Sequence, residues 1–291
     1  MLTNKLSASR RVYTAVMRAL LLLAAVLTAA LVVFMIVYVL YKGLPNVTWH
    51  LISTKPSYIT GAIGILPDIC NTVQILLASL LIVLPLGVGA AVYLTEYAQN
   101  KKLVAAIEYA AETLSGIPSI VFGLFGMALF VNYMDFGDSI LAGSLTLGLL
   151  SLPLVIRTTE EALKAIPDSM REGSRALGAT KLQTIWHVIL PMGMPNIITG
   201  LILALGRVSG ETAPILFTCA AYFLPQLPTG IFDQCMALPY HLYVISTSGT
   251  DMEAQLPIAY GTALVLILII LLVNLLANAL RKYFEKKIKT N

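Results

Sequence analysis

Long apolar segments recur along the chain and are separated by shorter polar connections. Six of them contain about 20 residues or more, the length that an α-helix needs to cross the hydrocarbon core of a bilayer. Their approximate bounds are residues 17–41, 69–95, 110–132, 139–157, 194–220 and 256–280. The pattern predicts an all-α, polytopic membrane protein with six transmembrane helices.

One internal connection, residues 157–191, is polar and basic and carries helix signals of its own. It contains two spacings typical of N-terminal capping boxes, Ser169 before Glu172 and Thr180 before Gln183. Gly178 lies between them, where a left-handed residue can end the first helix. Pro167 and Pro191 are expected to bracket the unit, because proline does not continue a helix interior. The connection therefore predicts a compact helix-turn-helix exposed to solvent.

The distribution of charge predicts the orientation of the chain. Hydrophobic residues make up 58% of the sequence and charged residues 12%. The N-terminus, the connection at 101–102, the connection at 157–181 and the C-terminal tail hold four, two, five and five of the 19 Lys and Arg residues. By the positive-inside rule both termini and the helix-turn-helix are expected in the cytoplasm. The segment 222–255 has no Lys or Arg and is expected on the other side, folded against the bundle.

Several kinds of chemistry lack the residues that they require. The chain has no phosphate-binding Gly-x4-Gly-Lys-Ser/Thr loop and no dinucleotide fingerprint, and its three histidines lack metal-ligand spacing. No nucleophile and base share a predicted span, so we expect a non-catalytic protein without a metal or a cofactor of its own. The three cysteines, Cys70, Cys219 and Cys235, are expected as buried free thiols, with a Cys219–Cys235 disulfide as the alternative. A secondary transporter is less favoured, because no internal repeat is evident.

Two charged residues, Arg207 and Glu211, lie inside a predicted span. If the fifth span begins near Met194, Arg207 lies roughly 20 Å along the helix, near the middle of the bilayer. A charge at that depth costs at least ~2.5 kcal/mol unless it faces a cavity or a partner. Two interpretations stay open: an internal ion pair that holds the helix in register, and a pathway arginine that binds an anion beside Glu211. By contrast, Glu108 and Glu112 are expected on a solvated helix face.

The polar connection resembles the coupling loop of permease subunits of bacterial ABC importers. Their motif has Glu, then Gly six positions later, then Leu-Pro, which match Glu172, Gly178, Leu190 and Pro191. Gly173 and Ser174 replace two alanines of the motif, and Val188 replaces an isoleucine. Four further stretches, at 86–98, 115–126, 154–163 and 206–217, are similar to the A-type permease subunit of the phosphate-specific importer. The resemblance covers about residues 60 to 280.

That resemblance implies a type I importer fold with an N-terminal helix and outer loop at 1–60 and a permease domain at 61–291. It implies half of a pathway that imports inorganic phosphate, with sulfate, molybdate or phosphonate as the alternative cargo. The implied partners are a homologous C-type permease, an ATPase dimer that binds ATP and Mg²⁺, and an extracytoplasmic phosphate-binding protein. The implied pathway residues are Arg207, Glu211 and Arg157, of which Arg157 is also explained as an interfacial arginine. The implied ATPase-coupling residues are Ser169, Glu172, Gly178, Thr180, Leu190 and Pro191.

Overall fold

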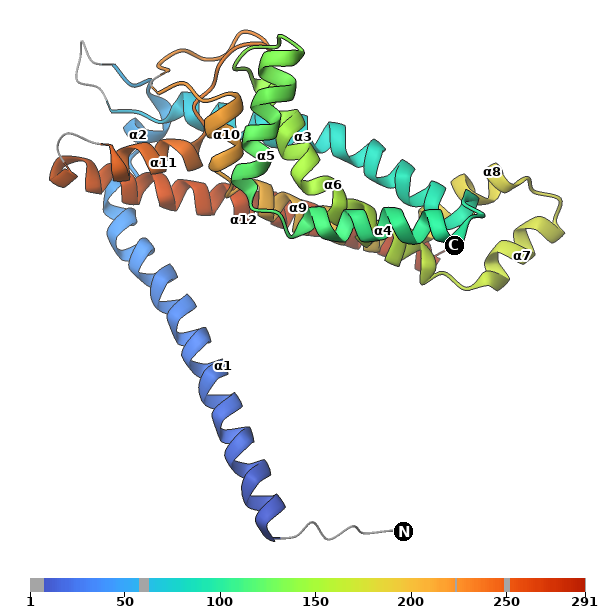
Figure 1. Ribbon diagram of the computed structural model, residues 1–291. Helices are drawn as coiled ribbons and strands as arrows, with labels where there is room; N and C mark the ends of the chain where they lie inside the picture. Colours follow the sequence, from blue (N-terminus) through green and yellow to red (C-terminus); the bar gives the residue numbers. More distant parts are fainter. Residues whose placement is uncertain (1–7, 58–62, 223, 249–251, 291) are drawn as a thin grey trace.

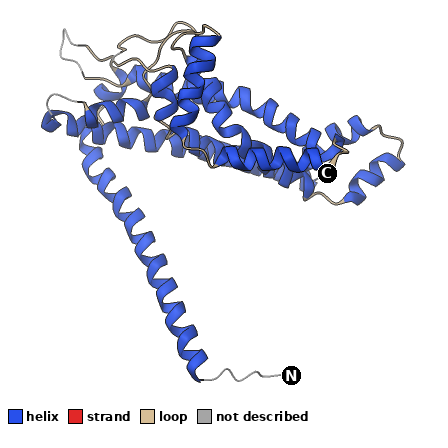
Figure 2. Ribbon diagram, viewed as in Figure 1, coloured by secondary structure: helices blue, strands red, loops and turns tan. Residues whose placement is uncertain are grey.

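A computed structural model describes residues 8–57, 63–222, 224–248 and 252–290, and in these ranges the chain is built from helices and loops (Figures 1 and 2). The longer helices are α1 (Ala8–Gly43), α3 (Leu66–Val92), α4 (Lys101–Ser115), α6 (Ile140–Lys164), α9 (Leu190–Val208) and α12 (Met252–Thr290). The shorter ones are α2 (Trp49–Ser53), α5 (Ser119–Gly126), α7 (Asp168–Ala176), α8 (Lys181–Thr184), α10 (Ala213–Thr218) and α11 (Leu238–Thr247). A 3₁₀ turn covers Leu44–Asn46, and π-helical turns cover Tyr93–Tyr97, Met127–Tyr133 and Ile185–Ile189. The prediction of an all-α protein is confirmed, while the expected domain boundary after residue 60 lies outside the described residues.

Five helical segments of the described chain are long and apolar enough to span a membrane. They are Val12–Asn46, Leu66–Tyr97, Ile140–Lys164, Lys181–Val208 and Gln255–Lys287. A sixth candidate is the pair Lys101–Ser115 and Ser119–Tyr133, which is bent by 102°. The predicted third span at 110–132 therefore contains a sharp bend. Pro118 lacks an N–H for the helix ladder, and its ring disfavours the α conformation at Ile117, so the helix breaks there.

The fifth segment also differs from its predicted bounds of 194–220. It is helical from Lys181 to Val208, and α10 is a separate short helix beyond a break at 209–212. The prediction that Pro191 brackets the coupling unit is wrong, because Pro191 lies inside this continuous helix. The π-helical turn at Ile185–Ile189 directly precedes it, with Leu190 N–H donating to Ile185 O. This wider turn makes room for the proline ring, and proline needs no acceptor for an N–H.

Helices α3, α6 and α9 pack around a shared apolar cluster that includes Val83, Val155, Leu163, Ile189 and Leu201. Helices α6 and α9 approach each other closely at Gly200 of α9. A Cβ at that position would overlap the side chain of Thr158 on α6. The small residue thus sets the separation of the two helices that carry the candidate site.

Helix α1 extends away from the other helices (Figure 1). Its C-terminal end contacts α12, where the Tyr38 and Tyr260 hydroxyls are 3.2 Å apart and the two rings pack edge to face. Gly43 also packs against Tyr260 and Leu264. Most of the apolar surface of α1 is left exposed by this chain.

The segment between α10 and α12 folds against the bundle, as predicted. Its helix α11 is tied to α3 by contact between His241 Nδ1 and Asp68 Oδ2, and Asn71 Nδ2 donates to Met236 O at 3.1 Å. In the preceding loop, Asp233 accepts hydrogen bonds from the hydroxyl and N–H of Thr229 and from Gly230 N–H. These bonds lower the pKa of Asp233.

Cys219 and Cys235 lie side by side in this region. Cys235 N–H donates to Cys219 O at 2.9 Å, and both side chains are buried. The two cysteines are free thiols, as expected, and the alternative disulfide is not formed. A hydrogen bond with Cys235, together with burial, raises the pKa of the Cys219 thiol well above its ordinary value.

Candidate functional site

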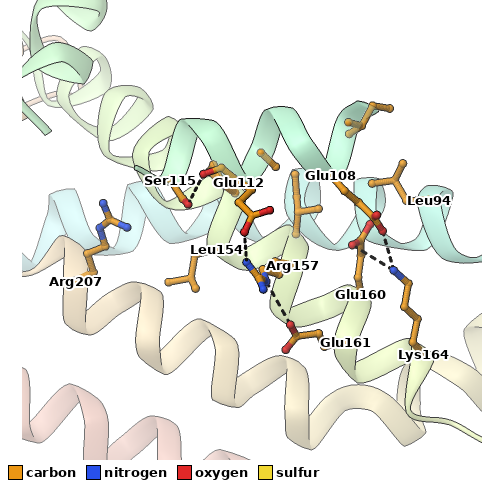
Figure 3. Close-up of a pocket in the computed structure, with 14 residues that line it drawn as sticks. Leu94, Glu108, Glu112, Ser115, Leu154, Arg157, Glu160, Glu161, Lys164 and Arg207 are labelled. Atoms are coloured by element: carbon orange, nitrogen blue, oxygen red, sulfur yellow. Dashed lines mark hydrogen bonds and ion pairs between the residues drawn. The ribbon is translucent and has the colours of Figure 1, made fainter. Parts of the chain in front are cut away.

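Helices α4, α6 and α9 contribute to a cavity of about 420 Å³ that is lined by seven charged side chains (Figure 3). Two expected pathway residues, Arg157 and Arg207, line it together. The other charged lining residues are Glu108 and Glu112 from α4 and Glu160, Glu161 and Lys164 from α6. The structure therefore brings together residues that are up to 99 positions apart in the chain.

Arg157 is held between carboxylates of two helices. Its Nε donates to Glu161 Oε1 at 3.3 Å on the same helix, and its Nη1 is 3.7 Å from Glu112 Oε1 on α4. The Arg157 side chain remains 62% exposed, so it keeps donor capacity for a ligand. Arg157 and Arg207 both line the cavity, and the interpretation of Arg157 as an interfacial arginine stays open.

Arg207 lies in the last turn of α9 rather than in the middle of a helix. The helix begins at Lys181, before Met194, where the predicted span starts, and the depth of Arg207 in the bilayer stays a prediction. Arg207 Nε and Glu211 Oε1 are 3.9 Å apart, so the expected pair forms, although loosely. The helix ends at Val208, and Glu211 thus reaches back from the loop beyond it.

A second ion-paired group lies beside Arg157. Lys164 Nζ is 2.8 Å from Glu108 Oε1 and 3.7 Å from Glu160 Oε2. The expectation of a solvated face for Glu108 and Glu112 misses these cross-helix pairs. The i, i+4 spacings of Glu108 with Glu112 and of Glu160 with Lys164 were the available signal, but only the packing of α4 on α6 aligns them.

The connection between α6 and α9 protrudes from one end of the bundle as α7 and α8 (Figure 1). Gly178 has φ +84°, as predicted for the left-handed residue between the helices. Thr180 and Gln183 form the predicted capping box. The box predicted at Ser169 and Glu172 is wrong: α7 begins at Asp168 with Pro167 at its N-cap, which leaves Ser169 inside the first turn.

The protruding unit exposes large apolar side chains. Leu177 is 91% exposed, and Met170, Leu182 and Trp186 are also exposed, as is Glu172. Pro191 is exposed, whereas Leu190 is only 8% exposed and belongs to the core of α6 and α9. Leu190 thus anchors the unit from inside and does not present a docking side chain.

Arg171 joins this unit to the bundle, a role that the sequence analysis missed. Its Nη2 is 2.9 Å from Glu96 Oε1 at the end of α3, and its Nη1 and Nη2 donate to Ile166 O and Leu163 O at 2.8 and 2.9 Å. The side chains of Arg171 and Glu96 are 13% and 7% exposed. One guanidinium therefore links α7, the end of α6 and the end of α3.

Comparison with known proteins decides the family. Residues 83–290 match the family model described as "Binding-protein-dependent transport system inner membrane component". The chain belongs to this family. It is thus a multi-pass permease subunit of an ABC importer in the inner membrane.

Relatives of this permease include proteins named for phosphate transport. The chain is 37% identical over 281 residues to the "Probable ABC transporter permease protein YqgI" of Bacillus subtilis, covering 92% of this chain and 95% of that protein. It is 33% identical over 241 residues to the "Phosphate transport system permease protein PstA" of Xylella fastidiosa, covering 82% of each. The PstA protein of Mycobacterium leprae is 39% identical over 213 residues, covering 72% of this chain and 68% of that protein. The resemblance to A-type phosphate permeases is therefore confirmed.

Solved importers share the fold of this permease. A chain of a bacterial ABC transporter that imports alginate aligns with a TM-score of 0.61 at 17% identity, covering 94% of this chain and 99% of that chain. A chain of the MetNI methionine transporter, in an inward-facing conformation, gives 0.58 at 20% identity, covering 76% and 94%. The expected type I importer permease fold is confirmed.

Proposed function

We propose that this permease forms half of a pathway that carries inorganic phosphate into the cell. The observation that carries the proposal is the shared cavity of Arg157 and Arg207. An anion that leaves water needs fixed positive charge along its path, and guanidinium groups bind tetrahedral oxyanions through paired N–H donors. The names of the PstA relatives favour phosphate over other oxyanions.

The two arginines are suited to binding that is reversible. Neither is locked in a short bidentate pair, since their closest carboxylate contacts are 3.3 Å for Arg157 and 3.9 Å for Arg207. A transported ion must bind well enough to enter and weakly enough to leave. Carboxylates that pair again with each arginine as phosphate leaves provide that balance. Glu211 is the carboxylate that pairs with Arg207.

The protruding α7–α8 unit is the proposed docking site for an ATPase dimer, which binds ATP and Mg²⁺ while this chain is non-catalytic. Its exposed Leu177, Leu182 and Trp186 are large apolar side chains of the kind that protein interfaces bury. Glu172, Gly178 and Thr180 shape or border this surface, and Ser169 and Pro191 lie exposed near it. ATP-driven closure of the ATPase dimer would then move α7 and, through Arg171, the ends of α3 and α6.

A homologous C-type permease supplies the other half of the pathway, and an extracytoplasmic phosphate-binding protein delivers the cargo. The α7–α8 unit and both termini lie in the cytoplasm in this proposal, in agreement with the distribution of Lys and Arg. The permease domain at 61–291 provides the pathway, and the N-terminal helix and loop at 1–60 flank it.

Uptake of labelled phosphate by the whole transporter tests the proposal, with sulfate, molybdate and phosphonate as competitors. Arg207→Gln should lower uptake by about 10- to 100-fold, the effect of losing a hydrogen bond to a charged group. Arg18→Gln, at an exposed position of α1, is the matched control and should transport normally. Undiminished uptake by an assembled Arg207→Gln complex would reject the pathway role, and stronger competition by sulfate than by phosphate would reject the cargo.

A further inference from the structure

The cavity that holds Arg157 and Arg207 has more carboxylates than cations. Its described lining has three basic side chains, Arg157, Lys164 and Arg207, against the four glutamates 108, 112, 160 and 161. A simple anion site would show an excess of positive charge. A bare anion that reaches Arg157 meets Glu112 and Glu161 on the same guanidinium, and each repels it.

The ligand that fits this arrangement must both accept and donate hydrogen bonds. Ionised carboxylates are acceptors only, and guanidinium groups are donors only. Singly charged phosphate carries two unprotonated oxygens, which accept from an arginine, and two hydroxyl groups, which donate to carboxylates. Sulfate has the same tetrahedral shape but carries no hydroxyl at neutral pH, so it leaves the carboxylates without a donor and adds repulsion.

Glu160 provides an independent sign that a donor is missing. Its side chain is 6% exposed and lines the cavity, and its Oε2 is 3.7 Å from Lys164. Its Oε1 is buried and has no hydrogen-bond partner among the described residues. A buried acceptor without a donor is costly, so Glu160 Oε1 requires a donor that the described residues do not supply.

We propose that the cavity selects oxyanions that carry an acidic hydroxyl, with Glu112 and Glu161 as the specificity-determining acceptors on either side of Arg157. The inference rests on the proposed function and assigns to this permease a selectivity step of its own. Phosphate and arsenate satisfy Arg157 and both carboxylates together. Sulfate and perchlorate accept hydrogen bonds from Arg157 but have no hydroxyl to donate to the two carboxylates.

The two carboxylates come from different helices, which makes their contributions separable. Glu161 follows Arg157 by one turn of α6, whereas Glu112 reaches across from α4. Replacing either by glutamine keeps its size and converts an oxygen acceptor into an amide that also donates. The variant cavity should therefore accept hydroxyl-free oxyanions better than the native one.

Ligand protection of a cysteine in the cavity tests the proposal without transport. Ser115 lines the cavity and is exposed, so Ser115→Cys in a Cys70→Ser background places one accessible thiol there. Its maleimide labelling rate is measured in the purified complex without nucleotide, with phosphate, arsenate, sulfate or perchlorate. Phosphate and arsenate should slow labelling at concentrations at which sulfate and perchlorate do not. Perchlorate matches the single charge of dihydrogen phosphate, so it separates the effect of charge from that of the hydroxyl.

Adding Glu112→Gln should lower the ratio of phosphate to sulfate protection by about tenfold, the effect of one hydrogen bond to a charged group. Glu161→Gln is the second variant, and Glu285→Gln, at an exposed position of α12, is the control that should change nothing. Equal protection by all four anions, or by phosphate and perchlorate, would overturn the hydroxyl selection. So would an unchanged ratio in both cavity variants. Absence of protection in a complex that still takes up phosphate would overturn the cavity site and leave the proposed function standing.

Discussion

Arg171 offers the sharpest test of how force reaches the membrane helices. Its guanidinium bonds to Glu96 and to two carbonyl oxygens at the end of α6, and both ionised side chains are largely buried. Arg171→Ala removes all of these bonds and leaves Glu96 as an uncompensated buried charge. Breaking a buried ion pair costs about 3–5 kcal/mol. We expect the lower end, about 3 kcal/mol, because water can reach the freed carbonyls at a helix end.

A change of that size shifts the equilibrium between docked and undocked α7 on the order of 100-fold. Hydrogen exchange of the α7 amides in the assembled transporter measures it, and exchange should accelerate correspondingly. Phosphate transported per ATP hydrolysed should fall in the same variant, since α7 no longer moves α3 and α6. Arg175→Ala, at an exposed position of the same helix, is the control and should leave both quantities unchanged.

A double-mutant cycle with Glu96→Gln decides whether the pair itself is responsible. The two substitutions should be non-additive, because each removes the same contact. Additive effects on exchange, or an Arg171→Ala variant with native exchange and native coupling, would refute the assignment. Arg171→Lys should be intermediate, because lysine keeps the charge but cannot serve the carboxylate and both carbonyls at once.

Three further predictions concern local structure. Thr180→Ala should destabilise α8 by about 1 kcal/mol through loss of its cap, while Ser169→Ala should change stability by less than about 0.5 kcal/mol, and comparative denaturation of the two variants checks the difference. Gly200→Leu should lower the thermal stability of the permease, because the side chain has no room beside Thr158; a variant as stable as the native protein would show that α6 and α9 separate easily. The lowered pKa of Asp233 means that its contribution to loop stability is complete above the unfolded pKa and is lost as pH falls through the folded pKa. Limited proteolysis of the loop should accelerate at that acid pH in the native chain, whereas Asp233→Asn should show no such step.

The sequence by itself determined the class of protein and much of the local structure of the coupling unit. Spans depend on the length of apolar runs, and the left-handed Gly178 and the Thr180 cap depend on neighbours within a few residues. The family followed from motifs, which are also local. For the same reason, spacing alone misplaced the cap at Ser169: it does not show that the helix is capped at Pro167, two residues earlier.

Tertiary structure decided where the charges meet. The sequence singled out Arg207 by its depth in an apolar run, and only the packing of α4, α6 and α9 places Arg157 in the same cavity. The pair of Arg171 with Glu96 joins residues 75 positions apart, which no local spacing encodes. Long-range ion pairs depend on which helices pack and at what register, and close contacts such as that of Gly200 of α9 with Thr158 of α6 set that register. The sequence therefore supplied the charges, and the packing of the helices paired them.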